Sequence, residues 1–354
     1  MVRLGVVGCG RVFWKHHAPA LRRVKRFQLV GLYDVDASRC EQAAQQFAEA
    51  KACRSLEELL ENPAVDAIAV LTPPVAHADA ALAALEARKH VLIEKPLATS
   101  VEACDRLIAT RDRCGRVALV CHNLRWHPLV RRAKLYVQVG QLGEYFLLHS
   151  IATHRTSRDE LPVWRQDEPF GAGILLNEAV HHFDLWRYLT GAEVAQAVAM
   201  VGGRLDPKTE AAVVVARLTT GLAATGIFGF GTRPANELEL WGTAGSLRLC
   251  LYRYDGWVRL PRGSYPGDLR ARWQEFWRWL RELPTLSAAW RAGGLFQQSF
   301  VGIWQHFADC IESGVKPEAP LEDGRAAVAV ARQLLDSLGR EGVGNSSWSR
   351  ADLL

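Results

Sequence analysis

The chain has 354 residues, of which 49% are hydrophobic and 23% are charged, and its formal net charge at pH 7 is +5. This length suits two domains, and the composition is that of a soluble protein with a well-packed core. The small positive excess does not indicate nucleic-acid binding, because nucleic-acid binders concentrate Lys and Arg on one face. It suits an anionic cofactor or substrate.

The sequence gives no sign of membrane insertion or secretion. The most apolar stretch, residues 211–231, contains Arg217 and several glycines, so no uncharged run reaches the ~18 residues of a membrane span. Val2–Val7 already begins a strand where a secretory signal would place a charged region. The eight cysteines form no CxxC pair, which is typical of reduced thiols. We therefore expect a cytoplasmic protein without a metal site.

The first third of the chain alternates short apolar runs with segments of helical period, and Ser55 and Ser100 stand at helix N-cap positions. The predicted strands are 3–8, 28–34, 67–71, 90–94 and 117–122, and the predicted helices are 13–25, 37–50, 55–60, 75–88 and 101–114. This alternation predicts a parallel sheet covered by helices, which binds ligands at the carboxyl ends of its strands.

The first predicted turn has the sequence Gly8-Cys9-Gly10-Arg11-Val12-Phe13. Its two glycines permit a tight turn and close approach of the backbone to a pyrophosphate, whereas Phe13 replaces the third glycine of the usual fingerprint. Asp34 ends the second strand near the spacing at which an acid binds a ribose 2′-hydroxyl, which favours NAD over NADP. Asp34 would also suit a simple turn, and nearby Arg39 leaves NADP open.

Glu94 and Lys95 close the strand at 90–94 and are followed by Pro96. A charged pair stopped by a proline indicates either the lip of a cleft or a solvated pair where the strand leaves the sheet. If the glycine turn holds a dinucleotide, Lys95 lies at the same edge of the sheet. A lysine there can accept and donate a proton during catalysis.

A second polar set lies on the predicted helix 176–189, which follows the glycine-rich segment 171–173. Asn177, His181 and Asp184 fall at i, i+4 and i+7 and share one face of that helix. A lone helix histidine is more often a core residue, but this polar face opposite Lys95 favours a catalytic role.

After residue 190 the pattern changes to short strands, which are joined by tight turns and indicate an antiparallel sheet. These strands are predicted at 194–201, 211–218, 223–230, 236–241, 247–252 and 257–260, ahead of helices at 299–312 and 324–338.

These residues resemble the Gfo/Idh/MocA oxidoreductases. The resemblance is carried by Gly8–Phe13, Leu71-Thr72-Pro73-Pro74 with His77, Glu94-Lys95-Pro96, Asn123-Leu124-Arg125, Gly140 to Glu144, Gly171-Ala172-Gly173 with His181-His182-Phe183-Asp184, and Glu322-Asp323-Gly324. It implies an α/β protein with a Rossmann domain over 1–122 and, over 123–354, an α/β domain with a large, mostly antiparallel open sheet. It also implies an NAD(P)-dependent dehydrogenase or reductase acting on a CH–OH or ketone of a sugar, cyclitol or sugar nucleotide. A homodimer or homotetramer paired through the open sheet is implied as well.

The resemblance also assigns roles to individual residues. Lys95 and His181 would transfer protons with Asn177, which stands where the family usually has aspartate. Because an amide offers only neutral hydrogen bonds, Lys95 is the better-supported base. The residues expected near substrate are Arg125, His154, Asn177, His181 and Asp184. Arg125 could instead form a salt bridge at a domain hinge, and Asp184 would orient His181 or a neighbour. The residues expected near the cofactor are Gly8, Gly10, Arg11, Val12, Phe13, Asp34, Arg39, Thr72, Pro73, His77, Glu94 and Lys95.

Two other functions are compatible with these motifs. Transient oxidation by a tightly held NAD would permit glycoside elimination or epimerisation without net redox change. A nucleotide-binding protein without turnover stays open because Asn177 and Ala179 depart from the family pattern.

Residues 262–297 lie outside the family pattern. Trp273, Phe276 and Trp277 recur at helical spacing with Leu280, among several arginines. A basic, aromatic helix suits contact with an anionic lipid surface or a lipid-linked sugar. The favoured alternative is an aromatic stripe buried in the core or at a subunit contact, with the arginines in water.

Overall fold

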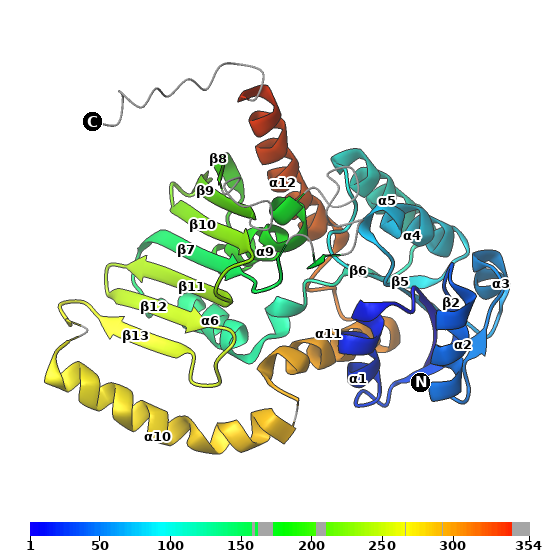
Figure 1. The fold of residues 1–354 in the computed structure, drawn as a ribbon, viewed down its shortest axis with the longest axis horizontal. Coiled ribbons are helices and arrows are strands. Elements are labelled where there is room, and N and C mark those ends of the chain that lie inside the picture. The colour runs from blue at the N-terminus through cyan, green and yellow to red at the C-terminus, as the bar shows by residue number, and fades with distance from the viewer. Residues whose placement is uncertain (158–159, 162–172, 203–209, 266, 292, 342–354) are drawn as a thin grey trace.

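The structure, a computed structural model, describes residues 1–157, 160–161, 173–202, 210–265, 267–291 and 293–341. Gly171 and Ala172 of the glycine-rich segment lie outside this range. Two sheets organise the described residues, and helices pack between and around them (Figure 1). The predicted two-part α/β architecture is confirmed.

The first sheet has six parallel strands in the order β3-β2-β1-β4-β5-β6. Its strands are β1 (Val2–Val7), β2 (Phe27–Tyr33), β3 (Lys51–Ala52), β4 (Ala67–Val70), β5 (His90–Ile93) and β6 (Ala118–Val120). Its helices are η1 (Phe13–His17), α1 (Ala18–Leu21), α2 (Ala37–Gln46), α3 (Leu56–Glu61), η2 (Pro74–Ala76), α4 (His77–Glu86) and α5 (Val101–Cys114). The strand order reverses between β1 and β4, and open α/β sheets bind ligands at the carboxyl ends of the strands on either side of such a reversal.

Local sequence explains most of these boundaries. Ser55 and Ser100 accept hydrogen bonds from Glu58 and Ala103 and cap α3 and α5, as predicted. The predicted helix 13–25 is instead a π-helical turn, η1, followed by the single turn α1. The two-residue strand β3 has no counterpart in the prediction, because a segment that short has no periodicity to detect.

The second sheet has seven strands in the order β13-β12-β11-β7-β10-β9-β8. Its strands are β7 (Tyr145–Thr153), β8 (Val194–Gly202), β9 (Glu210–Leu218), β10 (Ala223–Phe230), β11 (Ala235–Gly242), β12 (Gly245–Cys250) and β13 (Trp257–Pro261). The accompanying helices are η3 (Asn123–Trp126), α6 (Pro128–Gln138), η5 (Leu175–Ala179), α9 (Val180–Thr190), α10 (Leu269–Arg291), α11 (Leu295–Ser313) and α12 (Leu321–Glu341). Every pairing is antiparallel except that of β7 with β10.

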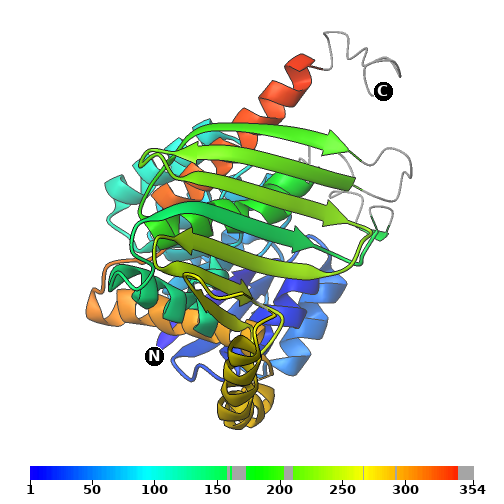
Figure 2. The ribbon, with the colours of Figure 1, turned by 90° about the vertical axis from the view of Figure 1, so that its left-hand side faces the viewer.

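One face of this sheet is covered and the other is open. Helices α6 and α9 lie behind the sheet, and the opposite face has no layer in front of it (Figure 2). Alternate residues on the open face expose apolar side chains: Val198, Met200, Val213, Val215 and Ile227.

The last two helices connect the two sheets. Trp304 of α11 is fully buried, with its ring centroid 5.0 Å from that of Phe27 on β2. On α12, a Cβ at Gly324 would lie 2.8 Å from Leu97, so this helix packs closely on the loop after β5. The chain therefore returns to the first sheet after it has built the second.

Trp304→Ala should destabilise the protein by about 3–5 kcal/mol, because it removes the aromatic contact between α11 and the first sheet and leaves a cavity. The measurement is urea unfolding followed by circular dichroism. Trp273→Ala is the control, since Trp273 is 59% exposed and its loss should change stability by less than about 0.5 kcal/mol. Equal losses in the two variants would contradict this role for Trp304.

Candidate active site

The turn after β1 contains two glycines, and a different physical constraint favours glycine at each position. Gly8 has a φ of +99°, and a Cβ there would lie 2.7 Å from the carbonyl carbon of Leu71, so the fold itself requires glycine. A Cβ at Gly10 would meet nothing within 4 Å. Close approach of a ligand is therefore the remaining physical reason for a glycine at position 10.

Phe13 does not occupy the ligand side of this turn. Its side chain is fully buried, with ring centroids 5.1 Å from Trp14 and 5.9 Å from Phe47. Phe13 therefore fills the core where a third glycine would bring helix and sheet together. Any contact it makes with a cofactor would come from its backbone. Arg11 beside it is exposed and Val12 is half-buried.

Asp34 lies against the glycine turn. One carboxylate oxygen accepts the N–H of Cys9 at 2.7 Å, and the other accepts the N–H of Asp36 at 2.9 Å. The residue thus forms a turn and also places a half-buried carboxylate at the carboxyl end of β2. Arg39, in the first turn of α2, pairs with Asp36 at 3.2 Å.

The loops after β4 and β5 are tied together by His77. Its Nδ1 lies 2.7 Å from the carbonyl oxygen of Pro96, and its Nε2 lies 2.8 Å from that of Thr72. Both ring nitrogens face main-chain carbonyls, and the neutral imidazole, which burial favours by lowering the pKa of His77, donates its one N–H to either of them. His77 thus packs between the two loops. The buried Thr72 hydroxyl has no hydrogen-bond partner among the described residues. That orphaned hydroxyl, the open position at Gly10 and the Asp34 carboxylate fit a dinucleotide along this edge.

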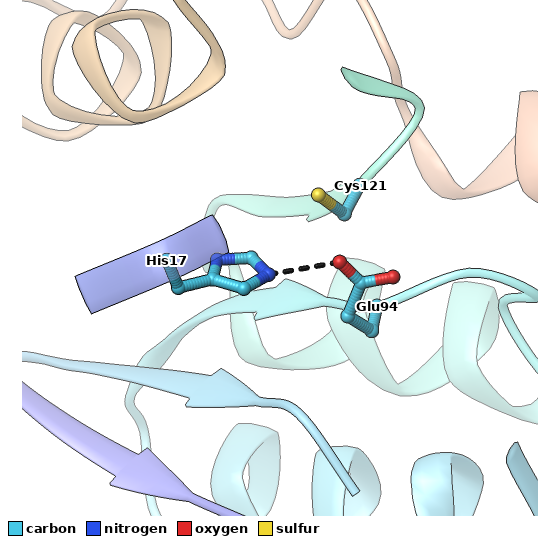
Figure 3. A group of neighbouring side chains, drawn as sticks. All are labelled: His17, Glu94 and Cys121. Carbon is cyan, nitrogen blue, oxygen red and sulfur yellow. Dashed lines mark hydrogen bonds and ion pairs between the residues drawn. The ribbon is translucent and has the colours of Figure 1, made fainter. Parts of the chain in front are cut away.

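Glu94 belongs to a buried polar cluster with His17 and Cys121 (Figure 3). His17 of η1 and Glu94 are joined by a hydrogen bond of 2.8 Å between Nε2 and Oε1, and the Cys121 thiol lies beside them. The other oxygen of Glu94 accepts the backbone N–H of Lys95 at 2.9 Å. Glu94 thereby fixes the point from which the Lys95 side chain leaves the strand.

The same contacts determine the charge state of Glu94. Burial alone would raise its pKa, but the hydrogen bond from His17, the charges of His17 and Lys95 and the Lys95 N–H together hold the pKa well below its ordinary value. Burial raises the pKa of Cys121 well above its ordinary value, so this thiol stays protonated. The ligand atoms of His17, Glu94 and Cys121 lie within 4.8 Å of one another, a convergence of metal-ligand types that sequence spacing did not reveal.

The Lys95 side chain reaches the second domain. Its Nζ donates a hydrogen bond of 2.6 Å to the main-chain carbonyl of Asn177, in the π-helical turn η5. The Asn177 side chain is buried and donates through Nδ2 to the carbonyl of Gly173 at 3.1 Å. π-helical turns are rare and frequently occur at functional sites. The contact from Asn177 to Lys95 is therefore made by backbone, which residue identity does not predict.

Lys95 is close enough to His181 for its charge to change the pKa of this imidazole. Burial lowers the pKa of His181 well below its ordinary value, and the positive charge of Lys95 lowers that pKa further. His181 is therefore neutral at pH 7, and its buried Nδ1 has no hydrogen-bond partner among the described residues. His154, just after β7, pairs with Glu178 of η5 at 3.2 Å and so lies beside the same turn. The structure thus brings Lys95, Asn177 and His181 together.

Arg125 and Asp184 belong to a buried ion-pair network instead. Nε of Arg125 donates to Asp184 at 2.8 Å, its Nη2 donates to the other carboxylate oxygen at 2.5 Å, and its Nη1 lies 2.6 Å from Asp323 of α12. Both residues are at most 3% exposed. This arrangement favours the salt-bridge alternative for Arg125, and it pairs Asp184 with Arg125 beside His122.

Sequence reasoning missed three buried residues of this region. His17 falls within the predicted helix 13–25, and Cys121 and His122 fall at the end of the predicted strand 117–122, where spacing assigns them no role. His122 lies 3.6 Å from Asp184, and burial lowers its pKa to about 4. The local signal for His17 is the polar run Lys15-His16-His17 between the apolar residues Val12–Trp14 and Ala18–Leu21.

The fold and site are those of an NAD-binding Rossmann protein: they combine the reversed strand order, the glycine turn after β1 and the Asp34 carboxylate after β2. Comparison with known families agrees. The model described as "Oxidoreductase family, NAD-binding Rossmann fold" matches residues 2–122, and the model described as "GFO/IDH/MocA C-terminal domain" matches residues 130–248. The chain belongs to the Gfo/Idh/MocA family of oxidoreductases, which confirms the resemblance found in the sequence.

Individual relatives give the same result. The chain is 31% identical over 248 residues to 1-carboxy-3-chloro-3,4-dihydroxycyclo hexa-1,5-diene dehydrogenase of Comamonas testosteroni, covering 68% of this chain and 61% of that protein. It is 28% identical to inositol 2-dehydrogenase 2 of Saccharopolyspora erythraea, over 95% of this chain and 93% of that protein. The crystal structure of the WlbA dehydrogenase from Bordetella pertussis, in complex with NADH and UDP-GlcNAcA, shares the fold. Its TM-score is 0.78 at 20% identity, with 96% of each chain covered.

Gly10→Ala should weaken NAD binding by about tenfold or more, since a methyl group would enter the space next to the turn, while thermal stability stays unchanged. The matched variant Gly8→Ala should instead lose at least about 1 kcal/mol of stability, because it combines positive φ with a backbone clash. Titration calorimetry with NAD and thermal unfolding separate the two effects. Full NAD affinity in Gly10→Ala would argue against a cofactor at this turn.

Proposed function

We propose that the protein is a dehydrogenase or reductase acting on a CH–OH or ketone carbon of a sugar, cyclitol or sugar-nucleotide substrate. The observation that carries the proposal is the contact of Lys95, at the cofactor edge of the first sheet, with η5 of the second domain beside His181. Relatives named inositol 2-dehydrogenase and a neighbour bound to UDP-GlcNAcA support the substrate class. The nicotinamide, when bound, supplies the hydride acceptor or donor.

Lys95 and His181 have different roles in the proposed proton transfer because they differ in charge. Two adjacent cations are unfavourable, so the neutral imidazole of His181 and the Lys95 ammonium make a compatible pair. In ketone reduction, Lys95 Nζ would donate a proton to the developing alkoxide. In alcohol oxidation, neutral Lys95 would take the hydroxyl proton, and His181 would hold the same oxygen by a hydrogen bond.

We assign the other residues expected near substrate to two different roles. His154 and Asn177 flank the same turn as His181, so we keep them as candidate substrate-binding residues. Arg125 and Asp184 are positioning residues in our proposal, because their charged groups are occupied by each other. Their network holds α9, which carries His181, against α12.

For the cofactor we favour NAD over NADP. The Asp34 carboxylate lies beside the glycine turn, and a negative charge there would repel a 2′-phosphate. Arg39 is paired with Asp36, which reduces its availability for a 2′-phosphate. The residues that would hold the dinucleotide are Gly8, Gly10, Arg11, Val12, Phe13, Asp34, Thr72, Pro73, Glu94 and Lys95.

We further expect a homodimer or homotetramer that buries the open face of the seven-stranded sheet. Val198, Met200 and Val215 expose a contiguous apolar surface there, and such surfaces commonly mark protein interfaces.

A direct assay tests the proposed function. Purified protein is incubated with NAD⁺ or NADP⁺ and a panel of polyols, sugars, sugar acids and nucleotide sugars, and absorbance at the NADH band is compared with product formed. Equal amounts of reduced cofactor and product support a dehydrogenase. Product without net NADH would indicate the glycoside-elimination or epimerase alternative, and no turnover on any substrate would count against the proposal.

Lys95→Ala should lower kcat by about 10²–10⁴-fold, the usual contribution of a positioned proton-transfer group, while NAD affinity is kept. Lys134→Ala is the matched control: Lys134 also donates to a main-chain carbonyl, that of Tyr188 at 2.6 Å, but on α6. Steady-state kinetics on the best substrate of the panel provides the measurement. Unimpaired turnover by Lys95→Ala would remove Lys95 from the mechanism.

Asn177→Asp should change the pH–rate profile. A carboxylate one helical turn before His181 would raise the pKa of this imidazole, opposing the lowering by burial and Lys95. As the pH is lowered, the variant would lose the activity that requires neutral His181 at a higher pH than the wild type does. The acidic limb of its pH–rate profile therefore moves toward neutrality. The measurement is kcat against pH for both proteins, with Asn177→Ser as a neutral control. An unchanged profile would mean that position 177 is not coupled to proton transfer.

A further inference from the structure

Helix α10 is joined to the body of the molecule by an ion pair, and the leucines beside that pair are half-buried. In Figure 1 the helix runs along the lower edge of the molecule, from below β13 toward the start of α11. On the side toward the body, Glu282 forms an ion pair of 3.5 Å with Arg132 of α6. Leu280 and Leu283 next to it are half-buried. An amphipathic surface helix normally presents its whole apolar stripe to the core, whereas among the described side chains of α10 only these two leucines of the stripe are half-buried.

The aromatic side of α10 is exposed. The exposed fractions are 59% for Trp273, 47% for Phe276 and 54% for Trp277, and Leu269 at the start of the helix is 83% exposed. The expectation of an aromatic stripe buried in the core is therefore wrong for these side chains. They contact one another instead: the Trp273 and Trp277 rings stack with centroids 6.1 Å apart, and Phe276 meets Trp273 at 5.7 Å.

Positive charge surrounds this aromatic surface. The sequence of α10 holds five arginines and two glutamates, and one of these, Glu282, is already paired with Arg132. Arg270, Arg272 and Arg281 are exposed on the helix, and Arg262 and Tyr265 are exposed just before it. No described helix is both long and apolar enough to span a bilayer.

We propose that α10 binds the surface of an anionic phospholipid bilayer. Trp273, Phe276 and Trp277 would enter the boundary between headgroups and acyl chains, and the arginines would lie at the lipid phosphates. Charge complementarity favours this partner over a second copy of the chain. A two-fold contact of α10 with α10 would bring two arginine-rich surfaces of the same sign together. The inference concerns where the enzyme is held and does not depend on its substrate.

The experiment is co-sedimentation of the full-length protein with vesicles of phosphatidylcholine alone and of phosphatidylcholine mixed with phosphatidylglycerol. We expect binding to the mixed vesicles that weakens as salt is added, because salt screens the arginine–phosphate attraction. Trp273→Ser/Trp277→Ser should lower the vesicle affinity by about tenfold or more. Its NAD binding and circular dichroism spectrum should stay those of the wild type, since both side chains are exposed.

Two further variants separate the contributions. Arg270→Gln/Arg281→Gln should lose the preference for phosphatidylglycerol. Phe146→Ser, which removes a 58% exposed aromatic from β7, is the matched control and should bind vesicles like the wild type.

Three outcomes would overturn the proposal. The protein could fail to bind either vesicle, or the tryptophan double variant could bind as well as the wild type. In the third, light scattering detects an oligomer of the wild type without lipid, the tryptophan double variant does not form that oligomer, and neither protein binds vesicles. That result would assign α10 to contact with a second copy.

Discussion

The buried carboxylate of Glu94 is the constraint on which the arrangement of the site depends. It is held ionised by His17 from the first helical turn of the chain, and its second oxygen binds the backbone N–H of Lys95. A charge buried this deeply is tolerated only with such partners. Because Glu94 is fixed, Lys95 leaves β5 in one direction and meets the carbonyl of Asn177. A strand end in the first sheet is thereby joined to a helix start beside the second.

A second buried polar network holds α9 against α12, and the returning helices α11 and α12 pack on the first domain. Arg125, Asp184 and Asp323 come from η3, α9 and α12, three elements far apart in the sequence. Removing one partner would leave an uncompensated buried charge, so these residues act as a unit. Trp304 of α11 adds an apolar contact to the first sheet. The roles that we propose for Lys95 and His181 at one substrate oxygen require this alignment, because neither domain carries both groups.

Two apolar surfaces remain on the outside of the described chain, and they differ in charge. The open sheet face exposes aliphatic residues such as Val198 and Val215 in regular alternation, as expected for a flat contact between like surfaces. Helix α10 exposes aromatic residues among arginines, which suits an anionic partner. The two surfaces therefore serve different partners in our proposals: a second subunit for the sheet and a lipid surface for the helix.

The sequence by itself determined the parallel sheet, the glycine turn, Asp34 and the Glu94-Lys95-Pro96 segment, because each depends on residue type and local spacing. It also determined the family. Only the tertiary structure decided that Arg125 pairs with Asp184, that His77 ties two loops, and that His17 supports Glu94, since these partners lie 59, 19 and 77 residues apart. It likewise decided that the contact of Asn177 with Lys95 is made by a main-chain carbonyl and that the aromatic side of α10 faces outward. Periodicity identifies the apolar side of a helix, but only the packing of the whole chain decides whether anything covers it.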